Sequence, residues 1–195
     1  MPLDFTFYLN SILLGIGLAM DAFSVSLANG LNEPCMRQRK MCGIAGIFAL
    51  FQGLMPMIGW ICVHTIVQKF AIFERFIPWI ALALLGFIGT KMLVEGIKNR
   101  NEPPCAAGGV GFAALLVQGV ATSIDALSVG FTIASHQLMA AILAAAIIAL
   151  VTFIICMGGL FIGRKAGTRL AGKAGIFGGA ILILIGLEIF ITGLI

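Results

Sequence analysis

Long apolar runs, separated by short polar loops, are the feature that most constrains how this chain can fold. A helix needs about 20 apolar residues to cross the hydrocarbon of a membrane. The sequence contains six runs of roughly that length, at residues 9–30, 43–64, 77–97, 112–134, 139–162 and 174–195. Hydrophobic residues make up 61% of the chain and charged residues only 10%, which excludes an ordinary soluble domain.

The six runs fill nearly the whole chain and leave no room for a soluble domain. Inside lipid, each segment must satisfy its own backbone hydrogen-bonding groups, which a helix does. We therefore expect an all-α membrane protein with six transmembrane helices, forming a single polytopic membrane domain over residues 1–195.

The basic residues favour one side of the membrane. Nine of them fall in the loops after the first, third and fifth runs, whereas the opposite loops hold only Lys69 and Arg75. Because loops rich in Lys and Arg stay in the cytoplasm, both termini are predicted to lie outside it. The same placement argues against nucleic acid as a partner, despite the net charge of +4. The five cysteines include no C-x-x-C pair, and we expect thiols on the cytoplasmic side, such as Cys35, to stay reduced.

The two halves of the chain carry a repeated motif. Residues 20–25, MDAFSV, match residues 124–129, IDALSV, and both read D-A-x-S-V. Residues 89–97, GTKMLVEGI, run parallel to residues 186–194, GLEIFITGL. Each half, about 8–98 and about 111–195, contains three runs, so the second must cross the membrane in the opposite sense. Inverted repeats of this kind are common in secondary transporters, whose substrate sites lie near the bilayer midplane.

Each copy of the motif places an aspartate, Asp21 or Asp125, near the middle of its run. An unpaired charge there costs about 2.5 to 3.5 kcal/mol even on the lenient insertion scale. One interpretation is structural, with each aspartate protonated or bonded to a neighbouring helix. The other is functional, with the two carboxylates converging on a cation that is moved by alternating access.

Neutral oxygens accompany the aspartates. Hydroxyls share the helix faces of the two acids, at Ser24, Thr122 and Ser128. Two amides, Gln52 and Gln118, also lie inside runs. Carboxylate, hydroxyl and amide oxygens suit Mg²⁺, Ca²⁺ or Mn²⁺, and the spacing alone does not choose among these ions.

Three further charges lie inside the runs. Lys91 and Glu95 are near the cytoplasmic end of the third run, where long side chains can reach the interface. Glu188 occupies the repeat position equivalent to Lys91. These residues are candidates for a charge pair between Lys91 and Glu188, or for proton coupling.

Four stretches together resemble the MntP family of bacterial manganese exporters: GLAMDAFSVSLANG, FQGLMPMIGW, GFIGTKMLVEGI and ATSIDALSVG. The resemblance implies a bacterial plasma (inner) membrane protein that expels Mn²⁺, with no cofactor. It implies that Asp21 and Asp125 are the central metal-handling acids, with Glu95 and Lys91 as charged positions of the family. Some relatives carry an acid where this chain has Gln52, so a third carboxylate is in doubt. Other divalent cations and a second copy of the chain are further candidate partners.

Two other classes share some of these features. An exporter of a small organic solute, such as an amino acid, could have the same architecture, and an intramembrane di-aspartyl enzyme could bury two aspartates. The sequence has no G-x-S-x-G motif, and both histidines, His64 and His136, fall near the predicted outer face. We therefore expect a transporter and not an enzyme.

Overall fold

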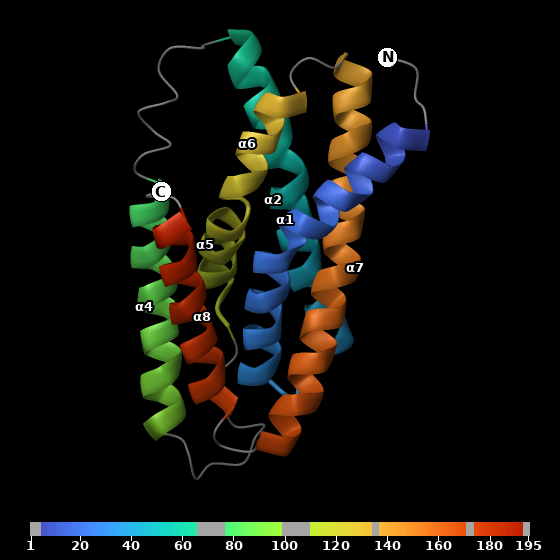
Figure 1. Ribbon diagram of the computed structural model, residues 1–195. Coiled ribbons are helices and arrows are strands. Elements are labelled where there is room, and N and C mark those ends of the chain that lie inside the picture. Colours follow the sequence, from blue (N-terminus) through green and yellow to red (C-terminus); the bar gives the residue numbers. More distant parts are fainter. Residues whose placement is uncertain (1–4, 66–76, 99–109, 134–136, 171–173, 193–195) are drawn as a thin grey trace.

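The computed structural model describes residues 5–65, 77–98, 110–133, 137–170 and 174–192, and every regular element in these ranges is helical. The helices are α1 (Phe5–Asn32), α2 (Gln38–Thr65), α4 (Ile77–Lys98), α5 (Phe112–Thr122), α6 (Ile124–Thr132), α7 (Leu138–Leu170) and α8 (Ala174–Thr192) (Figure 1). The all-α prediction is confirmed. Each predicted span coincides with one helix, except that the fourth is divided between α5 and α6.

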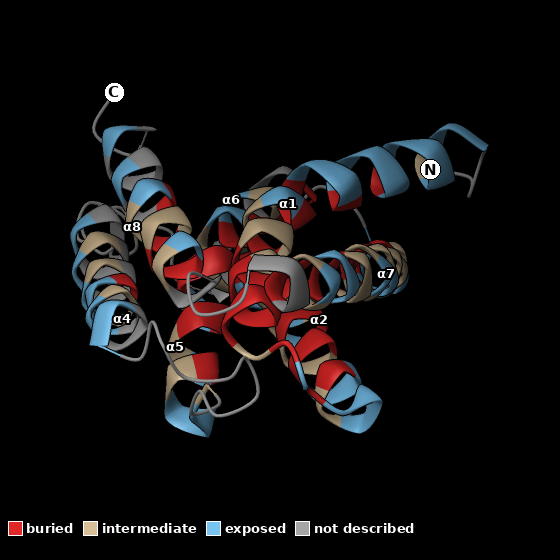
Figure 2. Ribbon diagram, turned by 90° about the horizontal axis from the view of Figure 1, so that it is seen from below, coloured by how far each residue is buried: buried red, intermediate tan, exposed pale blue. Residues whose placement is uncertain are grey.

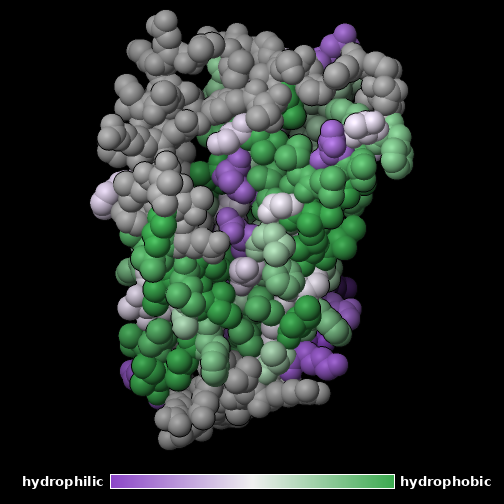
Figure 3. Space-filling model, viewed as in Figure 1, coloured by the Kyte–Doolittle hydropathy of each residue, from purple (hydrophilic) through white to green (hydrophobic). Residues whose placement is uncertain are grey.

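The number of helices that can cross a membrane is confirmed only in part. Among the described residues, α1, α2 and α7 are long and apolar enough, and α5 with α6 forms a fourth span bent by 42°. The face in Figure 3 is largely hydrophobic, with hydrophilic residues at its lower edge and a small group in its upper half. An apolar outer surface of this kind matches a lipid environment rather than water.

Three long elements surround the core. α1 and α2 both pack against α7, and α2 also contacts α6, whereas α4 packs mainly against α8. Buried residues concentrate where α1, α2, α5 and α7 meet (Figure 2). Many of those contributed by α1 are small, including Ala22, Ala28 and Gly30. Small residues let membrane helices approach closely, which is the main source of packing energy when lipid is as apolar as the side chains.

Two glycines make matching close contacts in the two halves. A Cβ added to Gly159 of α7 would lie 2.8 Å from the carbonyl oxygen of Phe23 in α1. A Cβ added to Gly59 of α2 would clash with the carbonyl oxygen of Leu127 in α6. Phe23 and Leu127 occupy the same place in the D-A-x-S-V motif. The second helix of each half therefore packs against the motif helix of the other half.

The C-terminal ends of α1, α4 and α7 lie at one end of the molecule, and the start of α1 and the end of α8 lie toward the other (Figure 1). At the first end, Arg164 of α7 donates to the carbonyl oxygen of Met36 at 3.3 Å, and Lys40 pairs with Glu33 at 2.6 Å.

Cys35, at the same end, is disulfide-bonded. The prediction that it stays reduced is therefore wrong in this structure. Spacing along the sequence did not reveal which cysteines the loops would bring together. Three other cysteines in the described part of the chain, Cys42, Cys62 and Cys156, are free thiols.

Candidate functional site

The fourth span is broken at Ser123, between α5 and α6. The hydroxyl of Thr122 donates to the carbonyl oxygen of Gln118 at 2.9 Å, and that of Ser123 donates to the carbonyl oxygen of Gly119 at 2.7 Å. Such back-bonding hydroxyls bend helices. The sequence analysis treated this span as continuous, although the adjacent Thr and Ser were the available signal. Discontinuous helices are typical of transporter binding sites, because the break frees polar backbone groups.

Asp125 lies in the first turn of α6, directly after the break. Its Oδ1 accepts a hydrogen bond from the backbone N–H of Ala126 at 2.8 Å. A carboxylate is stabilised at this end of a helix by the positive end of the helix dipole. The break therefore gives Asp125 local compensation for its charge.

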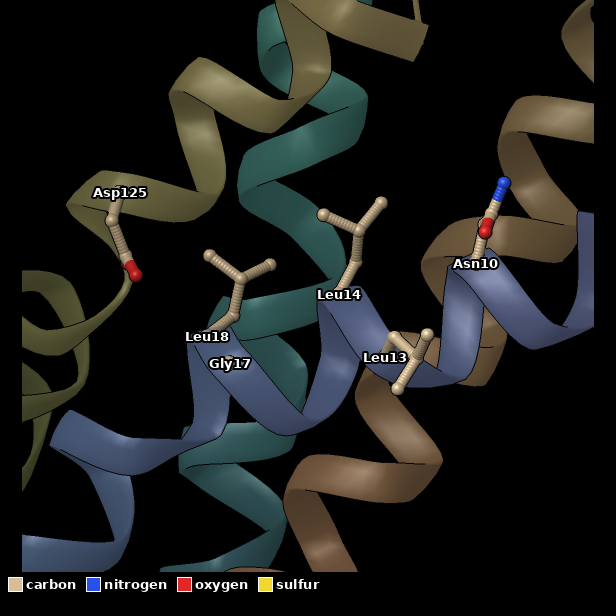
Figure 4. A pocket seen from close by; sticks show the side chains of 6 residues that line it. All are labelled: Asn10, Leu13, Leu14, Gly17, Leu18 and Asp125. Atoms are coloured by element: carbon tan, nitrogen blue, oxygen red, sulfur yellow. The ribbon is translucent and has the colours of Figure 1, made fainter.

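The Asp125 side chain lines a cavity of about 590 Å³ and points toward α1 (Figure 4). The other lining residues all come from the first half of α1: Asn10, Leu13, Leu14, Gly17 and Leu18. The carboxylate is exposed, so it can meet an ion that enters the cavity.

Asp21 is half-buried on α1 and lies close enough to Asp125 for the two side chains to interact electrostatically. The two acids that the repeated motif singled out therefore influence each other's charge. Two carboxylates at short range repel each other when both are ionised, and a cation or a shared proton between them removes that repulsion. A divalent cation would neutralise both charges at once.

The predicted neutral ligands have different surroundings. Gln52 is buried, and its Nε2 donates to the carbonyl oxygen of Leu18, a residue of the cavity wall, at 2.8 Å. Thr122 is buried beside the break, and Ser128 is exposed on α6. The Ser24 hydroxyl donates to the carbonyl oxygen of Met20, at 3.0 Å.

Gln118, the other predicted amide ligand, is paired instead with Asn29. Asn29 was not among the predicted site residues, because nothing in its own helix marks it as the partner of a residue 89 positions away.

The described residues contain no group of three His, Cys, Asp or Glu side chains arranged to hold a metal ion. Within these residues, Asp21 and Asp125 are therefore accompanied by neutral oxygens rather than by a third such side chain. The remaining predicted charges lie on the α4–α8 pair. Lys91 is exposed on α4, whereas the side chains of Glu95 and Glu188 are outside what the structure describes.

Comparison with known proteins identifies a family. Residues 35–190 match the family model described as "Putative manganese efflux pump". A protein of Ruminiclostridium cellulolyticum named "Putative manganese efflux pump MntP" is 41% identical over 180 residues, covering 92% of this chain and 93% of that relative.

Two archaeal proteins with the same printed name match over similar lengths. The one from Methanobrevibacter smithii is 39% identical and covers 95% of this chain and 98% of its own length. The one from Methanospirillum hungatei is 38% identical and covers 100% of this chain and 97% of its own. No solved structure matches the chain.

Proposed function

The chain belongs to the manganese efflux pump family, and we propose that it exports Mn²⁺ from the cytoplasm by alternating access around Asp21 and Asp125. The observation that carries the proposal is the convergence of the two motif acids beside a broken helix and an open cavity. Because the described activity of the family is efflux, the chain is a transporter rather than an enzyme. Mn²⁺ is then the transported substrate and not a resident cofactor.

The ligand chemistry of this site suits Mn²⁺. Two carboxylates supply charge, and hydroxyl and amide oxygens complete a set of hard donors, which excludes ions that require thiolates. Among the neutral candidates, Thr122 and Gln52 are best supported, because one adjoins the break and the other bonds to the cavity wall. Ser24, Ser128 and Glu95 stay candidates. Transport of other divalent cations, self-association, and a coupling role for Lys91 with Glu188 stay predictions.

We infer that the six helical segments form two inverted repeats, each of three spans. The matched contacts of Gly59 and Gly159 support this arrangement, because a pseudo-two-fold axis would generate one contact from the other. α4 and α8 are the third helices of the two halves, and they pack against each other. A pseudo-two-fold axis that runs between them would relate one to the other. The site would then lie near the axis, as in other transporters built this way.

We propose that the end of the molecule carrying Arg164 and Lys40 faces the cytoplasm of a bacterial plasma membrane. This orientation is supported by the contact between Arg164, at the basic end of α7, and Met36, in the basic segment after α1. Cysteine-accessibility labelling tests this orientation. Cysteines placed near Arg39 or Arg169 should be shielded from reagents added outside, and one at Ile195 should react. A cytoplasmic C-terminus would contradict both the orientation and the inverted repeats.

The transport proposal is tested by adding ⁵⁴Mn²⁺ to inside-out membrane vesicles that contain the protein. These vesicles should accumulate the ion in their lumen. Parallel measurements with Mg²⁺, Ca²⁺, Fe²⁺ and Zn²⁺ as competitors give the selectivity. A matched control is Glu33→Gln, which removes a carboxylate from the Lys40 ion pair at the molecule's end. Wild-type vesicles that accumulate no more Mn²⁺ than vesicles lacking the protein would refute the proposed function.

A further inference from the structure

Two buried amides join α1 to α5. Asn29 Nδ2 donates to Gln118 Oε1 at 2.8 Å, and Gln118 Nε2 donates to Asn29 Oδ1 at 3.3 Å. Both side chains have no exposed surface. Each amide therefore supplies the donor and the acceptor that the other needs, and the pair bridges the first span of each half of the chain.

The amide pair and the cavity lie on opposite sides of the aspartates. Asn29 is eight residues beyond Asp21, which is about 12 Å along the helix axis toward the C-terminal end of α1. Gln118 lies on α5, before the break that precedes Asp125. The cavity, in contrast, is lined by α1 residues between 10 and 18. An ion at the aspartates thus has open space on one side and the amide pair on the other.

The chain around the amide pair is closely packed. A Cβ added to Gly30 would lie 2.6 Å from the carbonyl oxygen of Leu160, so α1 and α7 are nearly in backbone contact there. Large apolar side chains from the start of α2 and its preceding loop are buried in the same core, including Met36, Met41, Ile44 and Phe48. In the described part of the chain, this close packing contrasts with the cavity on the other side of the aspartates.

We propose that the Asn29–Gln118 pair is the inner gate of the transport route. It seals the aspartates from the cytoplasm while the cavity is open to the outside, and it separates when Mn²⁺ loads from the cytoplasm. This inference rests on the proposed function and orientation. Two neutral amides suit the task, because a hydrogen bond between membrane helices contributes only about 0.6 to 2 kcal/mol and can reopen. Their freed oxygens can bind a divalent cation as it loses water.

A reporter cysteine at position 17 tests the gate without measuring transport. Gly17 lines the cavity, and a Cβ added there meets no atom within 4 Å, so Gly17→Cys fits the structure. Right-side-out and inside-out vesicles are treated with a membrane-impermeant maleimide. Modification at position 17 is then quantified by peptide mass spectrometry, which leaves the native thiols in place. With the gate intact, position 17 should react from the outside and only slowly from the cytoplasmic side.

Removing either amide should shift this accessibility. In the Gly17→Cys background, Asn29→Ala and Gln118→Ala should each raise the cytoplasmic labelling rate about tenfold, which corresponds to about 1.4 kcal/mol. The exchanged pair, Asn29→Gln with Gln118→Asn, keeps two amides and should restore the original rate. The control is Ser26→Ala, because this hydroxyl is buried on the same helix and lies beside Cys156 of α7, outside the amide pair.

The outcomes separate the gate from the transport proposal. Unchanged labelling in both alanine variants, at normal protein levels, would overturn the gate even if Mn²⁺ is transported. An equal shift in Ser26→Ala would also overturn it, since loosened packing would then suffice. Faster labelling from the cytoplasmic side in the parent would reverse the assigned orientation and remove the inner gate. Failure of the transport proposal appears instead as absent Mn²⁺ accumulation by wild-type vesicles.

Discussion

α1 and the α5–α6 pair carry the same D-A-x-S-V motif, yet α1 is a continuous helix and α5–α6 is bent by 42°. The residues before the two aspartates account for the difference. Thr122 and Ser123 bond back to their own helix, whereas the equivalent residues of α1 are Leu18 and Ala19, which cannot. Sequence equivalence therefore does not imply the same backbone.

The two aspartates also have different surroundings. Asp21 is half-buried on an unbroken helix, whereas Asp125 is exposed to the cavity at the start of α6. An ion in the cavity meets Asp125 directly. We therefore expect the continuous helix to supply a fixed ligand and the broken one to supply the ligand that moves.

The largest expected effect breaks the pair of acids itself. Asp21→Asn and Asp125→Asn keep the side-chain shape but remove one of the two charges that balance a divalent cation. Each should lower ⁵⁴Mn²⁺ transport at least about 100-fold, equivalent to about 2.7 kcal/mol, and abolish manganese tolerance in cells. The double variant should be no worse than either single, because residues that act as a unit are non-additive.

Protein levels in the membrane decide how this result is interpreted. They should stay nearly normal, and the Glu33→Gln control should transport as wild type does. Full efflux by either single variant would contradict the paired-carboxylate mechanism. Loss of protein from the membrane would favour the structural interpretation, in which the aspartates hold helices together.

The next effect tests whether the two halves pack equivalently. Gly59→Ala and Gly159→Ala each force a methyl group against a backbone carbonyl and should destabilise the protein by about 1 to 3 kcal/mol. The measurement is the heat-induced loss of the monodisperse peak of detergent-solubilised protein. Gly158→Ala is the matched control, since a Cβ there meets no atom within 4 Å. If only one of the two variants differs from that control, the two halves do not share the contact.

A smaller effect is expected from giving the broken span the residues of the continuous one. Thr122→Leu with Ser123→Ala removes the back-bonding hydroxyls and should straighten the helix, which moves Asp125 away from a helix start. We expect about tenfold slower Mn²⁺ transport at normal protein levels, equivalent to about 1.4 kcal/mol. Thr90→Ala is the control, because that hydroxyl bonds back to Gly86 in a helix without a break. Transport equal to that control would show that the break is dispensable.

The smallest effect concerns a hydroxyl on the continuous helix α1. Ser24 already donates to the carbonyl oxygen of Met20, so its loss should leave the backbone unchanged and remove at most a weak ligand. Ser24→Ala should change the concentration of Mn²⁺ at half-maximal transport by about twofold or less, within the net value of one neutral hydrogen bond. A tenfold rise would make Ser24 a principal ligand and reduce the asymmetry between the two helices.

Much of this architecture could be predicted from sequence, because apolar runs and repeated motifs are local signals. The helices follow the predicted spans closely, and the two motif aspartates interact electrostatically. The break at Ser123 was missed because hydrophobic length alone cannot distinguish one continuous helix from two shorter helices joined at an angle. The Asn29–Gln118 pair was missed because it depends on how two distant spans pack, and neither residue's own helix encodes that.

The closely packed layer around Asn29 also determines across which part of the protein the membrane potential falls. If the cavity opens to the outside, as proposed, it carries the outer potential inward to the aspartates, and most of the membrane potential falls across the closely packed half. A cell interior held negative opposes the exit of Mn²⁺ by about 4.6 kcal/mol per 100 mV, taking about 2.3 for each of its two charges. That cost arises while the ion crosses the sealed layer, and release from Asp125 into the cavity is nearly free of it.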